Sequence, residues 1–260
     1  MPKTERLPEI IVFAGPNGSG KSTVTRIAKV VQPYINADDI KTALNCSDLE
    51  AAQVAEKMRN AQVDAGEGFT FETVLSTSRN LELLKRAKAK GFFIRCIYVL
   101  TASPDINVIR VKAREAAGGH GVPEDKVRSR YKRALALIPE LVSVCDICHI
   151  YDNSEQPFRI FKKRKDQYYF AENTFWNKQD IITLTKVRNI VTFPSLKINS
   201  CKFVGRRVLH RAAAYYFYIS SVSALYGWDR LLSKETIVMW ITAKLLFLVM
   251  MDAIHQSISA

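Results

Sequence analysis

Short apolar runs alternate with amphipathic segments along the first 185 residues of the chain. Apolar runs of about four to eight residues are typical of buried strands, and apolar positions spaced three and four residues apart are typical of helices. The predicted strands are Glu9–Ala14, Tyr34–Asn36, Thr70–Val74, Phe92–Leu100 and Ile147–Tyr151. The predicted helices begin at Ser22 and Ile40 or cover Leu49–Ala65, Asn80–Lys90, Pro104–Ala117 and Pro123–Val144. This alternation predicts an α/β fold with a doubly wound parallel sheet.

The pattern changes after residue 185. Residues 186–260 contain 10 basic and 3 acidic side chains and two long apolar segments, Ala212–Trp228 and Thr236–Met251. We expect a domain at 1–185 and a basic, apolar, helical tail at 186–260. Each apolar segment is shorter than the roughly 20 residues that a membrane span needs, and Lys244 interrupts the second. A helical hairpin that packs on the domain or mediates self-association is therefore favoured over membrane attachment through 212–251.

Charge and cysteine content narrow the ligand class and the compartment. The chain has 38 Lys and Arg against 25 Asp and Glu, and its net charge of +13 favours polyanionic ligands. Four of its five cysteines lie in apolar runs, so we expect reduced thiols and a cytoplasmic protein. The segment Met1–Glu9 has no apolar core of the kind that a secretory signal contains.

A glycine-rich motif follows the first predicted strand and precedes a predicted helix. It fits the pattern G-x-x-x-x-G-K-[ST] and consists of Gly15, Pro16, Asn17, Gly18, Ser19, Gly20, Lys21, Ser22 and Thr23. Glycines in such a loop let successive backbone N–H groups turn inward and form an anion site at a helix N-terminus. In this motif Lys21 reaches the β- and γ-phosphates, and the Ser22 hydroxyl binds Mg²⁺. We therefore predict a P-loop that binds ATP with Mg²⁺.

Acidic residues follow two other predicted strands. Asp38 and Asp39 come just after the second strand, and Glu72 and Thr73 lie near the end of the third. Ligands of open α/β sheets bind at the carboxyl ends of the strands, so these side chains are candidates for the acceptor site. A carboxylate near the γ-phosphate can accept the proton of an attacking hydroxyl, and we assign this role to Asp38. Asp39 is interpreted as the N-cap of the next helix.

A basic segment surrounds a glycine-rich loop further along the chain. Arg110, Arg114 and Arg128 flank the sequence Gly118-Gly-His120-Gly-Val-Pro-Glu-Asp125. Arginines on such a loop can stabilise the charge that develops on a transferring phosphoryl group. The alternative for each arginine is a solvated helix residue, which is the more common role of charged side chains.

Taken together, these motifs resemble the zeta-toxin family of P-loop kinases, which includes UDP-N-acetylglucosamine kinases. The resemblance runs from Glu9 to Asn177 and adds Tyr151-Asp-Asn-Ser154 to the segments above. It implies transfer of the γ-phosphate of ATP to the 3′-hydroxyl of the sugar of UDP-N-acetylglucosamine. It also implies catalytic roles for Asp38, Lys21, Arg110, Arg114 and His120, with Glu72 and Thr73 at the acceptor. The implied partners are a sugar-nucleotide substrate and an antitoxin protein.

Two other functions stay open at this point. One is a kinase for a different hydroxyl, on a metabolite or on a nucleic-acid 5′ end. In many relatives the acidic strand reads Glu-Thr-Thr, whereas Val74 follows Thr73 here. The loss of a polar contact in a substrate pocket changes which substrate is bound more than it changes the reaction. The other is an ATP-binding switch without catalysis, which needs the P-loop but no acceptor-site base.

Two shorter motifs have competing interpretations. Cys145-Asp-Ile-Cys148-His149 matches the C-x-x-C-H pattern of haem attachment, but it leads into an apolar strand and is interpreted as a buried strand with reduced cysteines. The basic run Phe161–Lys165 could contact nucleic acid. We favour a hairpin with strands at Phe158–Phe161 and Gln167–Phe170, because no nucleic-acid recognition module accompanies the run.

Overall fold

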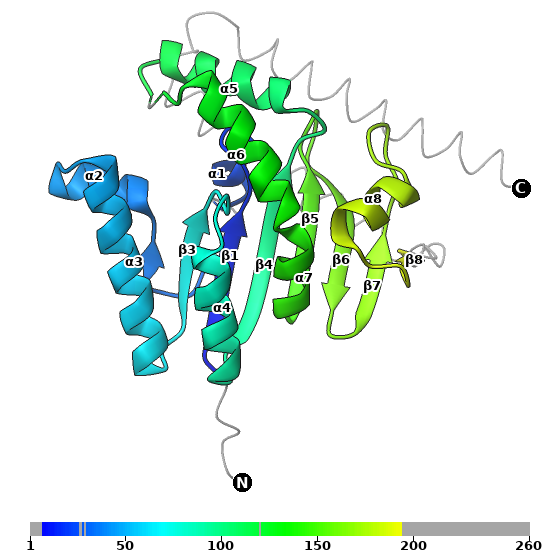
Figure 1. The fold of residues 1–260 in the computed structure, drawn as a ribbon, viewed down its shortest axis with the longest axis horizontal. Helices are drawn as coiled ribbons and strands as arrows, with labels where there is room; N and C mark the ends of the chain where they lie inside the picture. Colours follow the sequence, from blue (N-terminus) through cyan, green and yellow to red (C-terminus); the bar gives the residue numbers. More distant parts are fainter. Residues whose placement is uncertain (1–6, 26–27, 29, 120, 194–260) are drawn as a thin grey trace, which may run out of the picture. The chain divides into compact units, whose positions relative to one another are not determined.

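A computed structural model describes residues 7–25, 28, 30–119 and 121–193, and these residues form a mixed α/β sheet structure (Figure 1). Its strands are β1 Glu9–Ala14, β2 Tyr34–Ile35, β3 Phe69–Thr73, β4 Phe93–Leu100, β5 Ile147–Asp152, β6 Phe158–Arg164, β7 Gln167–Phe170 and β8 Val191–Thr192. Its helices are α1 Lys21–Thr25, α2 Ala37–Leu44, α3 Asp48–Ala65, α4 Arg79–Ala89, α5 Pro104–Ala116, α6 Glu124–Ala136, α7 Ile138–Val144 and α8 Lys178–Thr185.

The strands form one sheet in the order β2-β3-β1-β4-β5-β6-β7-β8. Neighbouring strands from β2 to β5 pair in parallel, β6 and β7 are added antiparallel, and β8 pairs in parallel with β7. Helices follow β1, β2, β3 and β4, as crossover connections between parallel strands require. The predicted α/β class with a mostly parallel sheet is confirmed.

The core lies around the central strand β1, which is buried from Ile10 to Ala14. Phe69 and Phe71 of β3 stack on the same core with ring centroids 5.8 Å apart. Because β1 is held by strands on both sides and is covered by apolar side chains, the loop that follows Ala14 starts from a fixed position.

Two predicted elements differ from the observed ones. The predicted helix Pro123–Val144 is divided into α6 and α7 at Leu137. Pro139 in the first turn of α7 has no N–H to donate, and its ring disfavours a continuous helix through the preceding residues. In the hairpin, the basic run lies in β6 up to Arg164, and only its last residue, Lys165, is in the turn with Asp166.

The helix after β2 begins earlier than predicted. Asn36, in extended conformation, is the N-cap of α2, and its side-chain oxygen accepts a hydrogen bond from the N–H of Asp38 at 3.0 Å. The prediction that Asp39 caps this helix is therefore wrong. Asp38 and Asp39 both lie in the first turn of α2, where the positive end of the helix dipole favours carboxylates.

The C-x-x-C-H motif lies in the core. Cys145 follows α7, and Cys148 of β5 lies opposite Cys96 of β4. All three are buried free thiols, as the interpretation of a buried strand with reduced cysteines predicts.

The sequence features of the tail fall on 194–260, outside the described residues. Residues 186–193 are described, and two of them form β8 at the edge of the sheet. The boundary at 185 and the helical tail stay predictions. Among the residues that the structure describes, no helix combines the length and the apolar character needed to cross a bilayer.

Candidate functional site

Three parallel strands end side by side at one edge of the sheet. β1 lies next to β3, with Ala14 opposite Thr73, and β2 lies on the other side of β3. The glycine-rich loop follows β1, Asp38 follows β2, and Glu72 lies near the end of β3. The sheet order therefore places the P-loop and the two acidic residues at the edge where α/β sheets bind ligands.

The P-loop has a conformation that requires glycine. Gly15 has φ 143°, and a Cβ there would lie 2.0 Å from the carbonyl oxygen of Val99 in β4. Gly20 has φ 92°, and a Cβ there would lie 2.2 Å from the Asn153 side-chain nitrogen. A side chain at Gly15 would collide with the backbone of β4 and one at Gly20 with the Asn153 side chain, and the positive φ strains any other residue at both positions.

Side chains from distant parts of the chain hold the P-loop in place. Asn107 of α5 donates a hydrogen bond to the carbonyl of Asn17 at 2.6 Å, and Asn153 donates to the carbonyl of Ser19 at 2.8 Å. Arg110 in turn donates to the carbonyl of Asn153 at 2.8 Å. The sequence analysis did not identify Asn107, because nothing local distinguishes it from other helix residues.

Lys21 folds back onto its own loop. Its Nζ donates hydrogen bonds to the carbonyl oxygens of Gly15 at 2.8 Å and Pro16 at 3.1 Å. Burial lowers the pKa of Lys21 to about 8, although Glu72 and Asp38 act in the opposite direction. An anion bound in the loop supplies negative charge to this ammonium group, which favours its protonated form.

A pocket of about 590 Å³ joins the P-loop to the acidic residues. Of the predicted site residues, it is lined by Asn17, Gly18, Gly20, Lys21, Ser22, Asp38, Glu72, Thr73, Arg110 and Arg114. Gly15, Pro16, Ser19 and Thr23 belong to the loop but do not line the pocket, and His120 lies outside the described residues. Asp39 also does not line it. The pocket can hold a nucleotide phosphate and an acceptor group at the same time.

The pocket contains oxygen donors of the type that Mg²⁺ prefers. The Ser22 hydroxyl and the Asp38 carboxylate both line it. Mg²⁺ in nucleotide sites is usually held by one or two protein oxygens together with substrate phosphates, so these residues fit that ion. Within the described part of the chain, no group of three or more His, Cys, Asp or Glu side chains is placed to hold a metal ion.

Glu72 is held on one side by two hydroxyl groups. Its Oε1 accepts hydrogen bonds from Tyr34 at 2.5 Å and from Thr25 at 3.1 Å. Burial and the bond to Glu72 raise the pKa of the Tyr34 hydroxyl, so it stays protonated and keeps donating. The Thr73 hydroxyl accepts from Asn80 at 2.8 Å, which leaves its proton available to a ligand. Tyr34 was not identified from the sequence.

Three arginines from α5 and α6 line the pocket on the side of the P-loop. Arg110 and Arg114 were predicted, whereas Arg130 of α6 was not. Arg130 lies 3.4 Å from the side-chain oxygen of Asn17 in the P-loop. Arg110 donates to the carbonyls of Asn153 and Ser154, so it also fixes the loop that holds the P-loop.

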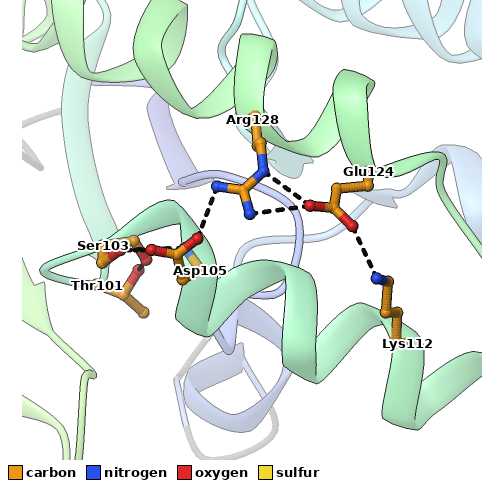
Figure 2. A network of polar contacts seen from close by, with 6 residues as sticks. All are labelled: Thr101, Ser103, Asp105, Lys112, Glu124 and Arg128. Carbon is orange, nitrogen blue, oxygen red and sulfur yellow. Dashed lines mark hydrogen bonds and ion pairs between the residues drawn. The ribbon is translucent and has the colours of Figure 1, made fainter.

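Arg128 has a different role from the one considered in the sequence analysis. It forms ion pairs with Asp105 at 2.7 Å and Glu124 at 2.9 Å, and Lys112 reaches Glu124 at 2.7 Å. Figure 2 shows that this network joins α5 to the first turns of α6: Arg128 reaches Asp105 at the start of α5, and Lys112, further along α5, reaches Glu124. Arg128 does not line the pocket, because a residue two positions away on a helix, here Arg130, points to the opposite side.

The fold is similar to that of known structures. A chain in the crystal structure of the AvrRxo1-ORF1:AvrRxo1-ORF2 complex with sulphate ions matches with a TM-score of 0.54 at 12% identity, over 70% of this chain and 64% of that chain. This chain therefore spans less than two thirds of that relative. A chain in the crystal structure of the same complex with ATP matches with a TM-score of 0.51 at 12% identity, over 76% of this chain and 67% of that chain. These similarities support the predicted P-loop kinase-like fold.

The sequence comparison gives a more direct relationship. No protein-family model matches the chain. An uncharacterized protein of Haemophilus influenzae is 34% identical over 127 residues, which is 46% of this chain and 91% of that protein. Because this identity extends over nearly the whole of the Haemophilus protein, the chain belongs to the same family as that protein.

Proposed function

We propose that this protein is an ATP-dependent P-loop kinase that phosphorylates the 3′-hydroxyl of the sugar of UDP-N-acetylglucosamine. The observation that carries the proposal is the single pocket that contains Lys21 and Ser22 of the P-loop together with Asp38 and Glu72. A phosphate donor site and an acceptor site with a base are the two parts that a kinase needs in one place. The choice of acceptor rests on the resemblance to the zeta-toxin family.

Each residue has a defined role in this proposal. The P-loop amides and Lys21 bind the β- and γ-phosphates, and Glu72 holds the acceptor through the oxygen that Tyr34 and Thr25 leave unused. Asp38 takes the proton of the acceptor hydroxyl while the oxygen of that hydroxyl attacks the γ-phosphorus. The bond from that phosphorus to the β–γ bridging oxygen breaks, and ADP leaves.

Charge stabilisation is assigned to the residues around the phosphates. Ser22 would hold Mg²⁺, which would neutralise charge on the β- and γ-phosphates. Arg110 and Arg114, with Arg130 beside them, stabilise the oxygens of the transferring phosphoryl group. His120 is assigned to the same group on the resemblance alone.

The test is ATP consumption with UDP-N-acetylglucosamine, other sugar nucleotides, nucleosides and 5′-hydroxyl oligonucleotides, followed by phosphorus NMR of the products. We expect a new phosphomonoester on the sugar 3′-oxygen of UDP-N-acetylglucosamine, and none when Mg²⁺ is omitted. A product only on a different acceptor contradicts the proposed substrate. ATP binding without a product on any acceptor contradicts the kinase and favours the ATP-binding switch.

We extend the proposal to a toxin with a protein partner. The matching chain with the similar fold was crystallised in a complex of two proteins, AvrRxo1-ORF1 and AvrRxo1-ORF2. Phosphorylation of a cell-wall precursor would arrest growth unless a partner protein blocked the site. We expect expression of the wild-type chain in bacteria to arrest growth and expression of Asp38→Asn to permit it. Equal growth of both strains contradicts the toxin role.

A further inference from the structure

Arg59 is a buried arginine on the wall of the pocket. It lies on α3, its side chain is 8% exposed, and its guanidinium carbon is 5.3 Å from the centre of the Phe71 ring on β3. Arg59 lines the 590 Å³ pocket together with Glu72 and Asn80. The sequence analysis and the proposed mechanism give it no role.

The charge of Arg59 has little compensation from the protein. Its Nε is fully buried and has no hydrogen-bond partner among the residues that the structure describes. Glu56, one turn earlier on α3, lies 3.8 Å from the exposed Arg79 and is paired with it. Burial lowers the pKa of Arg59, and Glu56 offsets this only in part. A buried guanidinium N–H without a hydrogen-bond acceptor costs stability, so the Nε of Arg59 points to a ligand.

The shape of α3 makes room for that ligand. Ala51, Ala55 and Arg59 are four residues apart and lie on one face of the helix. All three line the pocket, and the two alanines leave space between the helix and the end of β3. A second hollow of about 320 Å³ shares Arg59 and Asn80 with the main pocket. The cavity therefore extends from the P-loop along α3 to Arg59.

Arg59 lies apart from the arginines of the nucleotide side. In Figure 1, α3 lies at the β2 and β3 edge of the sheet, whereas α5 and α6, which carry Arg110, Arg114 and Arg130, lie near the ends of β4 and β5. The strand β1 and its P-loop come between the two groups in the sheet order. A nucleotide bound to the P-loop thus leaves Arg59 for the second substrate.

We propose that Arg59 binds a phosphate or diphosphate group of the acceptor, so that the acceptor is a phosphorylated hydroxyl compound. This inference rests on the proposed function, which places an acceptor in the pocket beside Asp38 and Glu72. The planar guanidinium group suits a phosphate because it can donate two parallel hydrogen bonds, and its position over the Phe71 ring holds it at this wall of the pocket. Asn80, which lines the same end of the pocket, offers a further polar group.

The test measures binding by calorimetry with the full chain, its P-loop saturated with Mg²⁺ and a non-hydrolysable ATP analogue. The probes are UDP-N-acetylglucosamine, inorganic pyrophosphate and N-acetylglucosamine, which lacks the diphosphate. Arg59→Gln should raise the Kd of the two phosphate-bearing probes by about 10-fold or more and leave that of N-acetylglucosamine unchanged. The matched control is Lys57→Gln, which removes a charge from an exposed position of the same helix and should bind all probes as the wild type does.

The outcomes separate this inference from the proposed function. Equal Kd values of Arg59→Gln and wild type for both phosphate probes overturn the inference, as does failure of both probes to bind the wild type. Binding of pyrophosphate that depends on Arg59, without turnover of UDP-N-acetylglucosamine, upholds the subsite and refutes the named acceptor. If Arg59→Gln does not fold, Arg59→Lys is tested instead, because it keeps the positive charge but loses the paired hydrogen-bond donors. If Arg59→Lys binds the phosphate-bearing probes as tightly as the wild type, the inference is overturned.

Discussion

The two halves of the pocket are built differently. In the nucleotide half, backbone carbonyls of the P-loop are bonded to Asn107 and Asn153, and Gly15 lies too close to β4 for any side chain. In the acceptor half, α3 presents alanines, and the buried Nε of Arg59 has no partner among the described residues. The first half is preorganised for one ligand class, whereas the second retains polar groups that a ligand must satisfy. Under the proposed function, selectivity for the acceptor therefore depends on the second half.

The largest effect is expected in the nucleotide half. Lys21→Ala removes the P-loop ammonium group proposed to bind the phosphates, and we expect phosphoryl transfer to fall below detection. The melting temperature should change little, because Lys21 contacts only carbonyls of its own loop through its Nζ. Kinetics and thermal melting of the purified variant check both points. Turnover at the wild-type level in a folded variant would rule out the nucleotide site.

The next largest effect is expected when two neighbouring carboxylates are replaced one at a time and the transfer rates are compared. Asp38→Asn should keep ATP binding and lower the transfer rate by about 10²–10⁴-fold, because it removes the base. Asp39→Asn is the matched control, since Asp39 lies in the same helix turn but does not line the pocket. Single-turnover rates decide between them. An inactive Asp39→Asn with an active Asp38→Asn would reverse the assignment of the base.

A smaller effect should appear in the pH dependence of ATP binding. The pKa of Lys21 is lowered to about 8, so in the free protein this group is protonated below that pH and loses its proton above it. Since phosphate binds the protonated form, the Kd for ATP should be nearly constant below pH 8 and rise about 10-fold by pH 9. Lys21→Arg, whose guanidinium does not titrate in this range, should bind with a Kd that does not change with pH. A flat profile in the wild type contradicts the lowered pKa.

The smallest effect concerns the support of Glu72. Tyr34→Phe removes one hydrogen bond to the Glu72 carboxylate, and we expect the KM for the acceptor to rise about 3- to 10-fold with little change in kcat or in ATP affinity. Tyr169→Phe serves as control, because the Tyr169 hydroxyl bonds to Gln167 away from the pocket. An unchanged KM in Tyr34→Phe means that Tyr34 does not position Glu72.

Much of the nucleotide half could be predicted from the sequence, because its signals are local. The strand Glu9–Ala14 was predicted with the bounds that the structure shows, since a continuous apolar run between polar residues leaves little choice of register. The P-loop glycines follow it directly. The start of α2 was misplaced because Asn36 and Asp39 are both good N-cap residues, and only the backbone conformation distinguishes them.

The acceptor half was harder to predict, because its contacts join distant residues. Tyr34 and Glu72 are 38 positions apart, and no periodic pattern connects them. Arg59 did give a signal that was not used: it occupies a buried position in the stripe formed by Ala51, Ala55 and Val63. A charged residue in an apolar stripe is unusual enough to indicate a ligand or a partner.

The ion-pair network in Figure 2 has a mechanical consequence. Arg128 connects Asp105 at the start of α5 to Glu124 at the start of α6, and Val108 and Val127 pack between the same two helices. The ion pairs hold α6 against α5 from Asp105 to Lys112, so we expect the two helices to move together. Under the proposed function, Arg110 on α5 and Arg130 on α6 would then approach or leave the transferring phosphate as a pair.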